Sequence, residues 1–378
     1  MKFIHLSDLH IGKRINEYSM LEDQAYILSS IIDIIDDVKP DAVIIAGDVY
    51  DKAIPSAEAV QLFDDFLVKL SERSLHVFVI SGNHDSPERI SFGARLMEKS
   101  GIHLSPVYDG HIKSVTLKDT YGSVHIHMLP FIKPAHVRRF YDEEDVVSYT
   151  DAVRVALSKQ AFNKNERNIL ITHQFVTGAQ RTESEEISVG GSDNVDLSVF
   201  EGFDYVALGH IHRPQSCGAD NIRYSGTPLK YSFSEAKDKK SVTVVELFEK
   251  GTVKISQIPL VPLRDMHEIK GTYNSVMMRD FYKDTTYTED YMHITLTDED
   301  DIPDAIGRLR TVYHNLMKLD YDNLRTRGEN IIDNVKYEES KTPLEHFSEF
   351  YELQNNQPMS QMQHEFIKNL IEKLGEGL

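Results

Sequence analysis

The chain has 378 residues, 40% of them hydrophobic and 27% charged, which is ordinary for a globular protein with one large and one or two smaller domains. No apolar run approaches the roughly 18 residues of a membrane span, and MKFIHLSDLH turns polar too soon for a secretory signal, so we expect no membrane association. The single cysteine, Cys217, excludes an internal disulfide and fits the cytoplasm, and the net charge of −19 argues against a broad basic surface for nucleic acid.

Short apolar runs alternate with longer amphipathic segments through residues 1–260, a pattern typical of α/β proteins. Helices are predicted at 21–38 and at 57–73, where Ser56 provides the N-cap. Connections of this length suit parallel crossovers, although periodicity alone does not fix the strand order. The predicted strands are KFIHL (2–6), AVIIA (42–46), VFVIS (77–81), NILIT (168–172) and YVALG (205–209).

The pattern changes near Met266, where acidic turns separate short strand-like segments. One helix is predicted at 302–316, and we expect a separate small α+β domain in this region. Pro343 then opens a segment with two amphipathic stretches, whose apolar residues recur at helical spacing. We therefore expect a large domain at 1–263, a small domain at 264–342 and a helical segment at 343–378.

Side chains with oxygen or nitrogen donors follow each of the five predicted strands. In open α/β sheets the carboxyl ends of the strands meet along one edge, so these residues should share one cavity. Glycine precedes Asp48, Asn83 and His210 and would let the backbone turn tightly there. The candidate site residues are Asp8, His10, Asp48, Asn83, His84, Asp85, His173, His210 and His212.

This mixture of carboxylate, amide and imidazole groups, without a thiolate, suits divalent ions such as Mn²⁺, Fe²⁺, Zn²⁺ or Mg²⁺. Seven of the residues are candidate ligands, which is more than one ion usually takes from a protein. Two ions about 3.5–4 Å apart, joined by one bridging carboxylate, account for the set best. The sequence therefore predicts a site for two divalent cations.

Each candidate ligand also has a plainer explanation. An Asp after a strand usually caps a helix or a turn, and a single His is usually an ordinary surface or core group. Ligation is favoured because five separate strand ends carry such side chains at once. His125 and His127 differ, since they lie inside a continuous strand-like stretch and share one face of it, so we leave them out of the site.

Five motifs in the chain together resemble the motif set of the calcineurin-like metallophosphoesterases. They are Asp8-x-His10, Gly47-Asp48, Gly82-Asn83-His84-Asp85, His173 and Gly209-His210-x-His212. The stretches GDVYDKAIPSAEAV, SGNHDSPERISFG and YSGTPLKYSFSE are similar to the SbcD family of nuclease subunits, bacterial relatives of the Mre-type DNA-repair nucleases. The resemblance covers most of the chain. It implies a four-layer β-sandwich flanked by helices, a small capping domain and two Mn²⁺ ions.

The resemblance also implies roles for single residues. His84 matches the catalytic histidine of the family, and Asp85 would orient His84 or cap the turn. Asp51 stands where some relatives have a substrate-contacting histidine. One ion would be held by Asp8, His10, Asp48 and His212, and the other by Asp48, Asn83, His173 and His210, with Asp48 as the bridge.

By the same resemblance, the chain would hydrolyse DNA phosphodiesters by in-line attack. It would act as an exonuclease on double-stranded ends and as an endonuclease on single-stranded or hairpin DNA, in repair, recombination and replication. Lys13, Arg14 and Arg89 are candidates to guide the phosphate backbone, because the local field matters more than the total charge. The plainer explanation for each of them is solvated surface charge.

The family supplies a partner, SbcC, an ATPase with a long coiled coil, in a heterotetramer that contains a homodimer of the nuclease subunit. The stretches within 343–378 could dock on that partner or pack on their own chain, and we favour docking because polar linkers flank them. Two other functions stay open. The scaffold could act as a cyclic-nucleotide phosphodiesterase or phosphoprotein phosphatase, or the chain could be an inactive scaffold subunit, although all the expected ligands are present.

Overall fold

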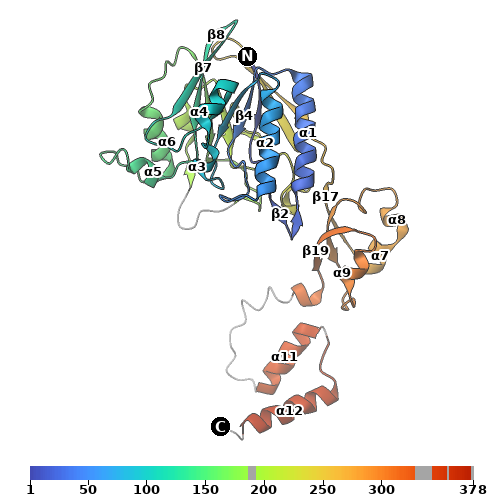
Figure 1. The fold of residues 1–378 in the computed structure, drawn as a ribbon. Coiled ribbons are helices and arrows are strands. Elements are labelled where there is room, and N and C mark those ends of the chain that lie inside the picture. Colours follow the sequence, from blue (N-terminus) through green and yellow to red (C-terminus); the bar gives the residue numbers. More distant parts are fainter. Residues whose placement is uncertain (186–192, 328–342, 356, 376–378) are drawn as a thin grey trace. The chain divides into compact units, whose positions relative to one another are not determined.

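The computed structural model describes residues 1–185, 193–327, 343–355 and 357–375 (Figure 1). The chain forms two compact units, Met1–Asp265 and Met266–Leu378. The expected three-part division at 263/264 and 342/343 stays a prediction, and residues 328–342 of the expected small domain lie outside the described residues. Among the described helices, none is both long enough and apolar enough to cross a membrane.

The first unit contains two six-stranded sheets. The strands of the first sheet are β1 (Lys2–Leu6), β4 (Ala42–Ala46), β5 (His76–Ile80), β6 (Ile102–Leu104), β15 (Ser241–Leu247) and β16 (Val253–Pro259). Those of the second are β7 (Lys113–Asp119), β8 (Gly122–Leu129), β9 (Arg167–His173), β12 (Tyr205–Gly209), β13 (Gln215–Cys217) and β14 (Ala219–Tyr224). The orders are β16–β15–β1–β4–β5–β6 and β13–β14–β12–β9–β8–β7.

Helices cover the outer faces of the two sheets, which makes four layers (Figure 1). The helices are α1 (Leu21–Val38), α2 (Ala57–Ser71), α3 (Pro87–Ile90), α4 (Ala94–Met97), α5 (Pro134–Arg138) and α6 (Tyr149–Ser158). The 3₁₀ turns are η1 (Glu98–Ser100), η2 (Leu197–Phe200) and η3 (Phe233–Glu235), and the short strand pairs are β2 (Arg14–Ile15) with β3 (Tyr18–Ser19) and β10 (Phe175–Val176) with β11 (Asn194–Val195). The predicted α/β sandwich flanked by helices is confirmed.

The inner faces of the two sheets pack on each other and form the main core. Phe3 and Phe78 of the first sheet lie in one buried cluster with Ile126 and Tyr205 of the second. On the outer face, Ile27, Ile31 and Ile35 of α1 recur every four residues and are all buried. Burying one such side chain contributes about 1.5–3 kcal/mol, so the apolar spacing decides which helix face turns to the sheet.

The predicted strands and helices before residue 210 are all present, with shifts of a residue or two at some ends. The Oγ of Ser56 accepts from the backbone N–H of Ala59 and caps α2 as expected. β1, β4, β5 and β6 run parallel, as do β8, β9, β12 and β14. Within each sheet, the carboxyl ends of these parallel strands therefore lie along one edge.

The second unit contains a three-stranded parallel sheet of β17 (Met266–Gly271), β18 (Tyr291–Leu296) and β19 (Asn315–Tyr321). Its helices are α7 (Tyr273–Met277), α8 (Arg279–Tyr282) and α9 (Ala305–Leu309), followed by α11 (Pro343–Asn355) and α12 (Gln361–Gly375). One face of the sheet packs with α7 and α9 around Met292, Ile294 and Tyr313. This confirms small α+β elements after Met266 and a helical C-terminal region.

The helix predicted at 302–316 is wrong in its length, because only Ala305–Leu309 is helical and β19 already begins at Asn315. Gly307 weakens this helix by about 1 kcal/mol relative to alanine. The hydroxyl of Tyr313 donates to the buried carbonyl of Val276 at 2.6 Å, which holds the turn before β19. Pairing of β19 with β18 therefore overrides the helical periodicity.

Candidate metal centre

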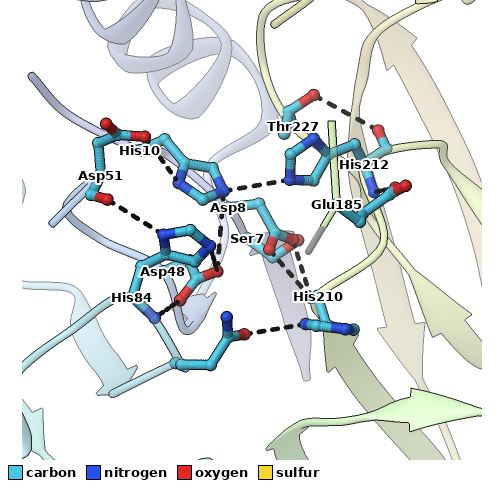
Figure 2. Close-up of polar contacts among 12 residues, drawn as sticks. Ser7, Asp8, His10, Asp48, Asp51, His84, Glu185, His210, His212 and Thr227 are labelled. Carbon is cyan, nitrogen blue, oxygen red and sulfur yellow. Dashed lines mark hydrogen bonds and ion pairs between the residues drawn. The ribbon is translucent and has the colours of Figure 1, made fainter. Parts of the chain in front are cut away.

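The candidate ligands meet where the carboxyl ends of strands from both sheets come together (Figure 2). Asp8, Asp48 and Asn83 follow β1, β4 and β5 of the first sheet. His173 ends β9 and His210 follows β12 of the second sheet. The sandwich therefore supplies the centre from both of its halves, and the convergence expected from the strand ends is what the structure shows.

The backbone at the centre is held in an uncommon conformation. Asp8, His10, Asp48 and His210 have φ angles of 52°, 44°, 47° and 105°, in the left-handed region that non-glycine residues seldom occupy. Each such residue costs on the order of 1–3 kcal/mol. Hydrogen bonds between the two loops compensate, since the N–H of Asp8 donates to Gly47 O and that of His10 to Asp48 O, both at 3.0 Å.

Two glycines allow the loops to approach this closely. A Cβ on Gly82 would lie 2.1 Å from Oδ1 of Asp48, and a Cβ on Gly209 would lie 1.9 Å from the carbonyl oxygen of Ala46. No larger residue fits at either place without moving the chain. The sequence predicted tight turns at these glycines, but a positive φ of 87° occurs only at Gly47, and Gly82 and Gly209 instead allow a close approach of two segments.

One side of the centre is formed by Asp8, His10 and His212, whose ligating atoms lie within 4.8 Å of one another. Nε2 of His10 lies 3.1 Å from Nε2 of His212 and 3.7 Å from Oδ2 of Asp48. Figure 2 shows the two imidazoles pointing toward each other. Two ring nitrogens this close share one proton or one cation, so the pair is a fitting ligand set.

The other side is formed by Asn83, His173 and His210. Oδ1 of Asn83 lies 3.0 Å from Nε2 of His173 and 2.9 Å from Nδ1 of His210. Nδ1 of His173 lies 2.8 Å from the carbonyl oxygen of Ala46, which can only accept, so Nδ1 carries the hydrogen. Nε2 of His173 then faces two acceptors, Asn83 Oδ1 and, at 3.3 Å, Asp48 Oδ2. Such an arrangement calls for a positive charge at this position.

Asp48 lies between the two sides. Its Oδ2 is 3.7 Å from Nε2 of His10 and 3.3 Å from Nε2 of His173. Asp8 also belongs to two of the clusters, but both of its carboxylate oxygens accept the backbone N–H of His210, at 2.9 and 3.2 Å. The Asp48 carboxylate is thus the better placed of the two for bridging.

Burial and charge set the protonation of the centre when no cation is bound. Burial raises the pKa of Asp8 to about 6, and the charge of Asp48 adds to this shift. Burial acts in the same direction on Asp48, but the positive charge of His173 and its hydrogen bond hold the pKa of Asp48 well below its usual range. Asp48 therefore stays ionised at lower pH than Asp8 does.

The histidines divide into two groups. Burial lowers the pKa of His10 and of His210 well below the usual value, so both are neutral and offer a lone pair. Burial would also lower the pKa of His173, but the charge of Asp48 and its hydrogen bond raise it to about 9. A proton on His173 Nε2 thus occupies the place of a cation, and the residues present fit a pair of divalent ions.

His84 stands beside this ligand set. Its backbone N–H donates to Oδ1 of Asp48 at 2.9 Å, and its Nδ1 lies 3.1 Å from the carbonyl oxygen of Asp51. Its Nε2 lies 4.0 Å from Oδ2 of Asp48. The ring is therefore held by the loop after β4 and turned toward the centre.

The carboxylate of Asp85 is occupied by backbone groups. It accepts three backbone N–H bonds, from Gly82 at 2.9 Å, Tyr50 at 3.0 Å and Val49 at 3.1 Å. Burial nevertheless raises its pKa to about 6, with the charge of Asp48 as the next cause. The geometry favours the turn-capping alternative for Asp85 over the orienting role, which the carbonyl of Asp51 performs instead.

The three basic residues considered for DNA contact differ in their surroundings. Nζ of Lys13 pairs with Oδ1 of Asp51 at 2.7 Å, which brings it next to the centre. Arg14 bonds to the carbonyl of Glu17 and is exposed, and Arg89 is exposed on α3. Their proposed role in substrate binding stays a prediction.

The two histidines that were left out lie away from the centre, on β8. His125 contacts Thr116 and Glu166, and His127 contacts Ser114 and Asn168.

Other residues contact the ligands but were not singled out from the sequence. Gln24 on α1 donates to His10 O at 2.7 Å, and Ser184 lies 2.6 Å from Nδ1 of His212. Neither follows a strand, so the pattern that found the ligands could not find them.

The chain is similar to known protein families. The calcineurin-like phosphoesterase family matches residues 1–214, and a family described as type 5 capsule protein repressor C-terminal domain, SbcD_C, matches residues 262–355. A dimetal phosphatase from Danio rerio is a structural neighbour with 13% identity and a TM-score of 0.39, covering 69% of this chain and 99% of its own.

Two curated relatives are each named as the D component of the nuclease SbcCD. The one from Staphylococcus saprophyticus is 35% identical over 324 residues, 84% of this chain and 84% of that protein. The one from Staphylococcus epidermidis is 31% identical over 376 residues, 98% of each chain. The chain therefore belongs to the calcineurin-like phosphoesterase family of metal-dependent hydrolases and, within it, to the SbcD nuclease subunits.

Proposed function

We propose that this chain is the nuclease subunit of an ATPase–nuclease complex that cleaves DNA phosphodiesters with Mn²⁺, in repair, recombination and replication. The observation that carries the proposal is the donor set itself, in which two carboxylates, one amide and four imidazoles from both sheets meet next to His84. The name of the curated relatives supports a nuclease. We propose exonuclease action on double-stranded ends and endonuclease action on single-stranded or hairpin DNA.

The cofactor in this proposal is a pair of Mn²⁺ ions, although oxygen and imidazole donors also suit Mg²⁺, Fe²⁺ and Zn²⁺. When bound, such a pair lowers the pKa of water and polarises the oxygens of the scissile phosphate. The proposed ligands of one ion are Asp8, His10, Asp48 and His212, and those of the other are Asp48, Asn83, His173 and His210.

The chain's own residues would orient the phosphate and manage a proton. His84 is fixed through Nδ1 by the carbonyl of Asp51, and its Nε2 is turned toward the centre. We propose that it holds a proton at Nε2 and gives it to the leaving oxygen. A general acid of this kind contributes about 10²–10⁴ in rate. Asp85 contributes by holding the loops after β4 and β5 in place.

DNA would reach the centre through local positive charge. Lys13 lies beside Asp51 at the edge of the centre, and Arg14 and Arg89 are exposed in the same unit. These three residues are the proposed phosphate contacts. Since the whole chain carries a net charge of −19, affinity for DNA in isolation should be low.

The proposed partner is an SbcC-type coiled-coil ATPase, in line with the complex named for the curated relatives. Helices α11 and α12 contact each other and enclose an apolar groove of about 290 Å³. The groove is lined by Phe347, Tyr351, Met359, Met362, Gln363, Phe366 and Ile367. An apolar stripe on a coiled coil would cover side chains such as Met362 and Phe366, which are exposed on α12.

We also propose a homodimer within a heterotetramer. Phe92 and Leu96, in the segment from α3 to α4, are 82% and 79% exposed. Apolar side chains this exposed mark an interaction surface when they lie together, and Ile54 just before α2 is exposed as well.

The single cysteine, Cys217, is a buried free thiol, which supports a cytoplasmic location.

One experiment separates this function from its rivals. The purified chain, loaded with Mn²⁺, is assayed side by side on linear double-stranded DNA, hairpin DNA, a cyclic nucleotide and a phosphopeptide, with and without the ATPase. Cleavage of both DNA substrates, enhanced by the ATPase, is expected. Turnover of the cyclic nucleotide or the phosphopeptide alone would favour the other phosphoesterases, and two bound ions without any turnover would favour a scaffold subunit.

A further inference from the structure

His212 is connected to a row of polar side chains that leads away from the centre. Its Nδ1 lies 2.6 Å from Oγ of Ser184, and the Ser184 hydroxyl donates to Oε1 of Glu235 at 2.5 Å. A carboxylate accepts and does not donate, so the hydroxyl hydrogen of Ser184 points to Glu235. The oxygen of Ser184 then accepts the Nδ1 hydrogen of His212. This leaves the lone pair of His212 on Nε2, the atom that faces His10.

The far end of this row is fixed by Lys240. Its Nζ donates to Oε2 of Glu235 at 2.5 Å, to Oγ1 of Thr227 at 2.8 Å and to the carbonyl of His212 at 2.9 Å. All three ammonium hydrogens are thus used, and an ammonium group cannot accept a hydrogen bond. Glu235 is 0% and Lys240 5% exposed, so water does not compete for these bonds. The direction of every hydrogen bond in the row is set from this end.

We propose that Ser184, Glu235 and Lys240 form a positioning relay, which keeps the Nδ1 of His212 protonated and its Nε2 free to bind a divalent cation. The inference rests on the proposed ligand role of His212. A second contact supports it, because the backbone N–H of His212 donates to Oε1 of Glu185 at 2.7 Å. Ring and backbone of His212 are thus held by adjacent residues of one loop, Ser184 and Glu185.

The relay makes an unusual prediction for Glu235→Gln. Lys240 offers only hydrogens, so the new amide would turn its oxygen toward Lys240 and its NH₂ toward Ser184. Ser184 Oγ would then accept from the amide and donate to Nδ1 of His212. The imidazole hydrogen would move to Nε2, where it blocks the cation. Removing the ammonium in Glu235→Gln/Lys240→Met frees the amide to rotate back, so the double variant should bind cations better than the single one.

The experiment measures Mn²⁺ binding by titration calorimetry and the spin-coupled signal of the Mn²⁺ pair by electron paramagnetic resonance, with folding checked by circular dichroism. Glu235→Gln should weaken the binding of one of the two ions by about 10- to 100-fold and abolish the coupled signal. A loss of this size is usual when a group that hydrogen-bonds to a metal ligand is replaced. Glu235→Gln/Lys240→Met should recover at least part of the affinity. The control is Glu246→Gln with Lys254→Met, a surface pair 3.1 Å apart on neighbouring strands, which should change nothing.

Two results would overturn the relay. One is a double variant that binds Mn²⁺ no better than Glu235→Gln, because a merely structural contact would lose affinity further. The other concerns Ser184→Ala, which serves as the test if the Glu235 variants do not fold. Ser184→Ala should weaken the binding of one ion, and unchanged affinity for both ions would contradict the relay. If the unaltered chain binds fewer than two ions, the proposed function fails instead, so the two failures are distinguishable.

Discussion

Nδ1 of His84 lies 3.1 Å from the carbonyl oxygen of Asp51, to which it donates a hydrogen bond. This bond leaves Nε2 of His84 pointing at the centre, 4.0 Å from Oδ2 of Asp48. His84 is also close to His10, with ring centroids 4.8 Å apart. It is therefore near enough to be a ligand or to act on the substrate, and the two roles differ in what a substitution removes.

His84→Ala should keep both Mn²⁺ ions and lose about 10²–10⁴ in phosphodiesterase turnover, because it removes a proton donor and no ligand. Metal analysis of the purified variant and single-turnover kinetics check the two parts separately. His125→Ala, which alters a histidine on β8 away from the centre, is the control and should retain both properties. A loss of bound metal in His84→Ala would mean that His84 is a ligand.

Asp48→Ala should empty both sites, since Oδ2 of Asp48 lies between His10 and His173. Loss of the carboxylate also removes the main partner that keeps His173 protonated in the cation-free protein. Metal content after dialysis gives the readout, and Asp36→Ala, at an exposed pair with Arg73, is the control. Two tightly bound ions in Asp48→Ala would contradict the bridging role.

Asp85→Asn should lower stability rather than act directly on the proton transfer. The carboxylate serves three backbone N–H groups through its two oxygens, whereas an amide has one acceptor oxygen and adds a donor. A buried N–H left without an acceptor costs about 1–3 kcal/mol. Chemical denaturation of the cation-free protein measures this difference. Unchanged stability with a large loss of turnover would instead favour an orienting role for Asp85.

Asp119→Asn tests an ion pair far from the centre. Hydrogen bonds from Arg167, followed by the N-terminal ammonium of Met1, hold the pKa of Asp119 below its usual value of 3.8. A lowered pKa stabilises the folded chain above about pH 4, and this contribution is lost as the pH falls toward the folded-state pKa. The substitution should therefore cost about 2 kcal/mol at pH 7 and progressively less below pH 4.

The free energy of unfolding of Asp119→Asn and of the unaltered chain, measured by urea titration from pH 7 to pH 3, checks this prediction. Asp36→Asn is the matched control, because Asp36 also pairs with an arginine but is exposed, so its effect should be much smaller at every pH. A difference for Asp119→Asn that stays constant down to pH 3 would show that the charge is not what stabilises the contact.

Deleting residues 343–378 should abolish co-purification with the SbcC-type ATPase and leave Mn²⁺-dependent cleavage of a small phosphodiester intact. Phe366→Glu, in the groove between α11 and α12, should have the same effect with the rest of the segment present. Glu365→Gln, at the neighbouring exposed residue that does not line the groove, should not. A truncated chain that fails to fold would show that the segment packs on its own chain.

The ligands could be predicted because they obey a rule that sequence alone reveals. Each lies at or just after the end of a short, largely buried strand such as AVIIA, and parallel strands place their carboxyl ends together. Asp85 fits the same rule for another reason, since its carboxylate serves backbone N–H groups of Val49 and Tyr50 that no linear pattern connects to it. Position after a strand predicts proximity to the centre and does not decide the role.

Other features depend on contacts that sequence distance hides. Ser184, Glu235 and Lys240 come from a loop, a 3₁₀ turn and the residue before β15, so they share no periodicity with the ligands. The only trace of them is that Glu235 ends the stretch YSFSE, which carried part of the family resemblance. The helix predicted at 302–316 failed because pairing of β19 with β18, a long-range interaction, outweighs local helical spacing.

The division of the donors between the sheets has a thermodynamic consequence. Asp8, Asp48 and Asn83 come from one half of the sandwich, and His173, His210 and His212 come from the other. Cations can be bound only while the halves are docked, so binding stabilises that docked state and no half by itself. Separation of the halves should therefore release both ions together, and added cations should restore the stability of a variant with weakened packing between β4 and β12.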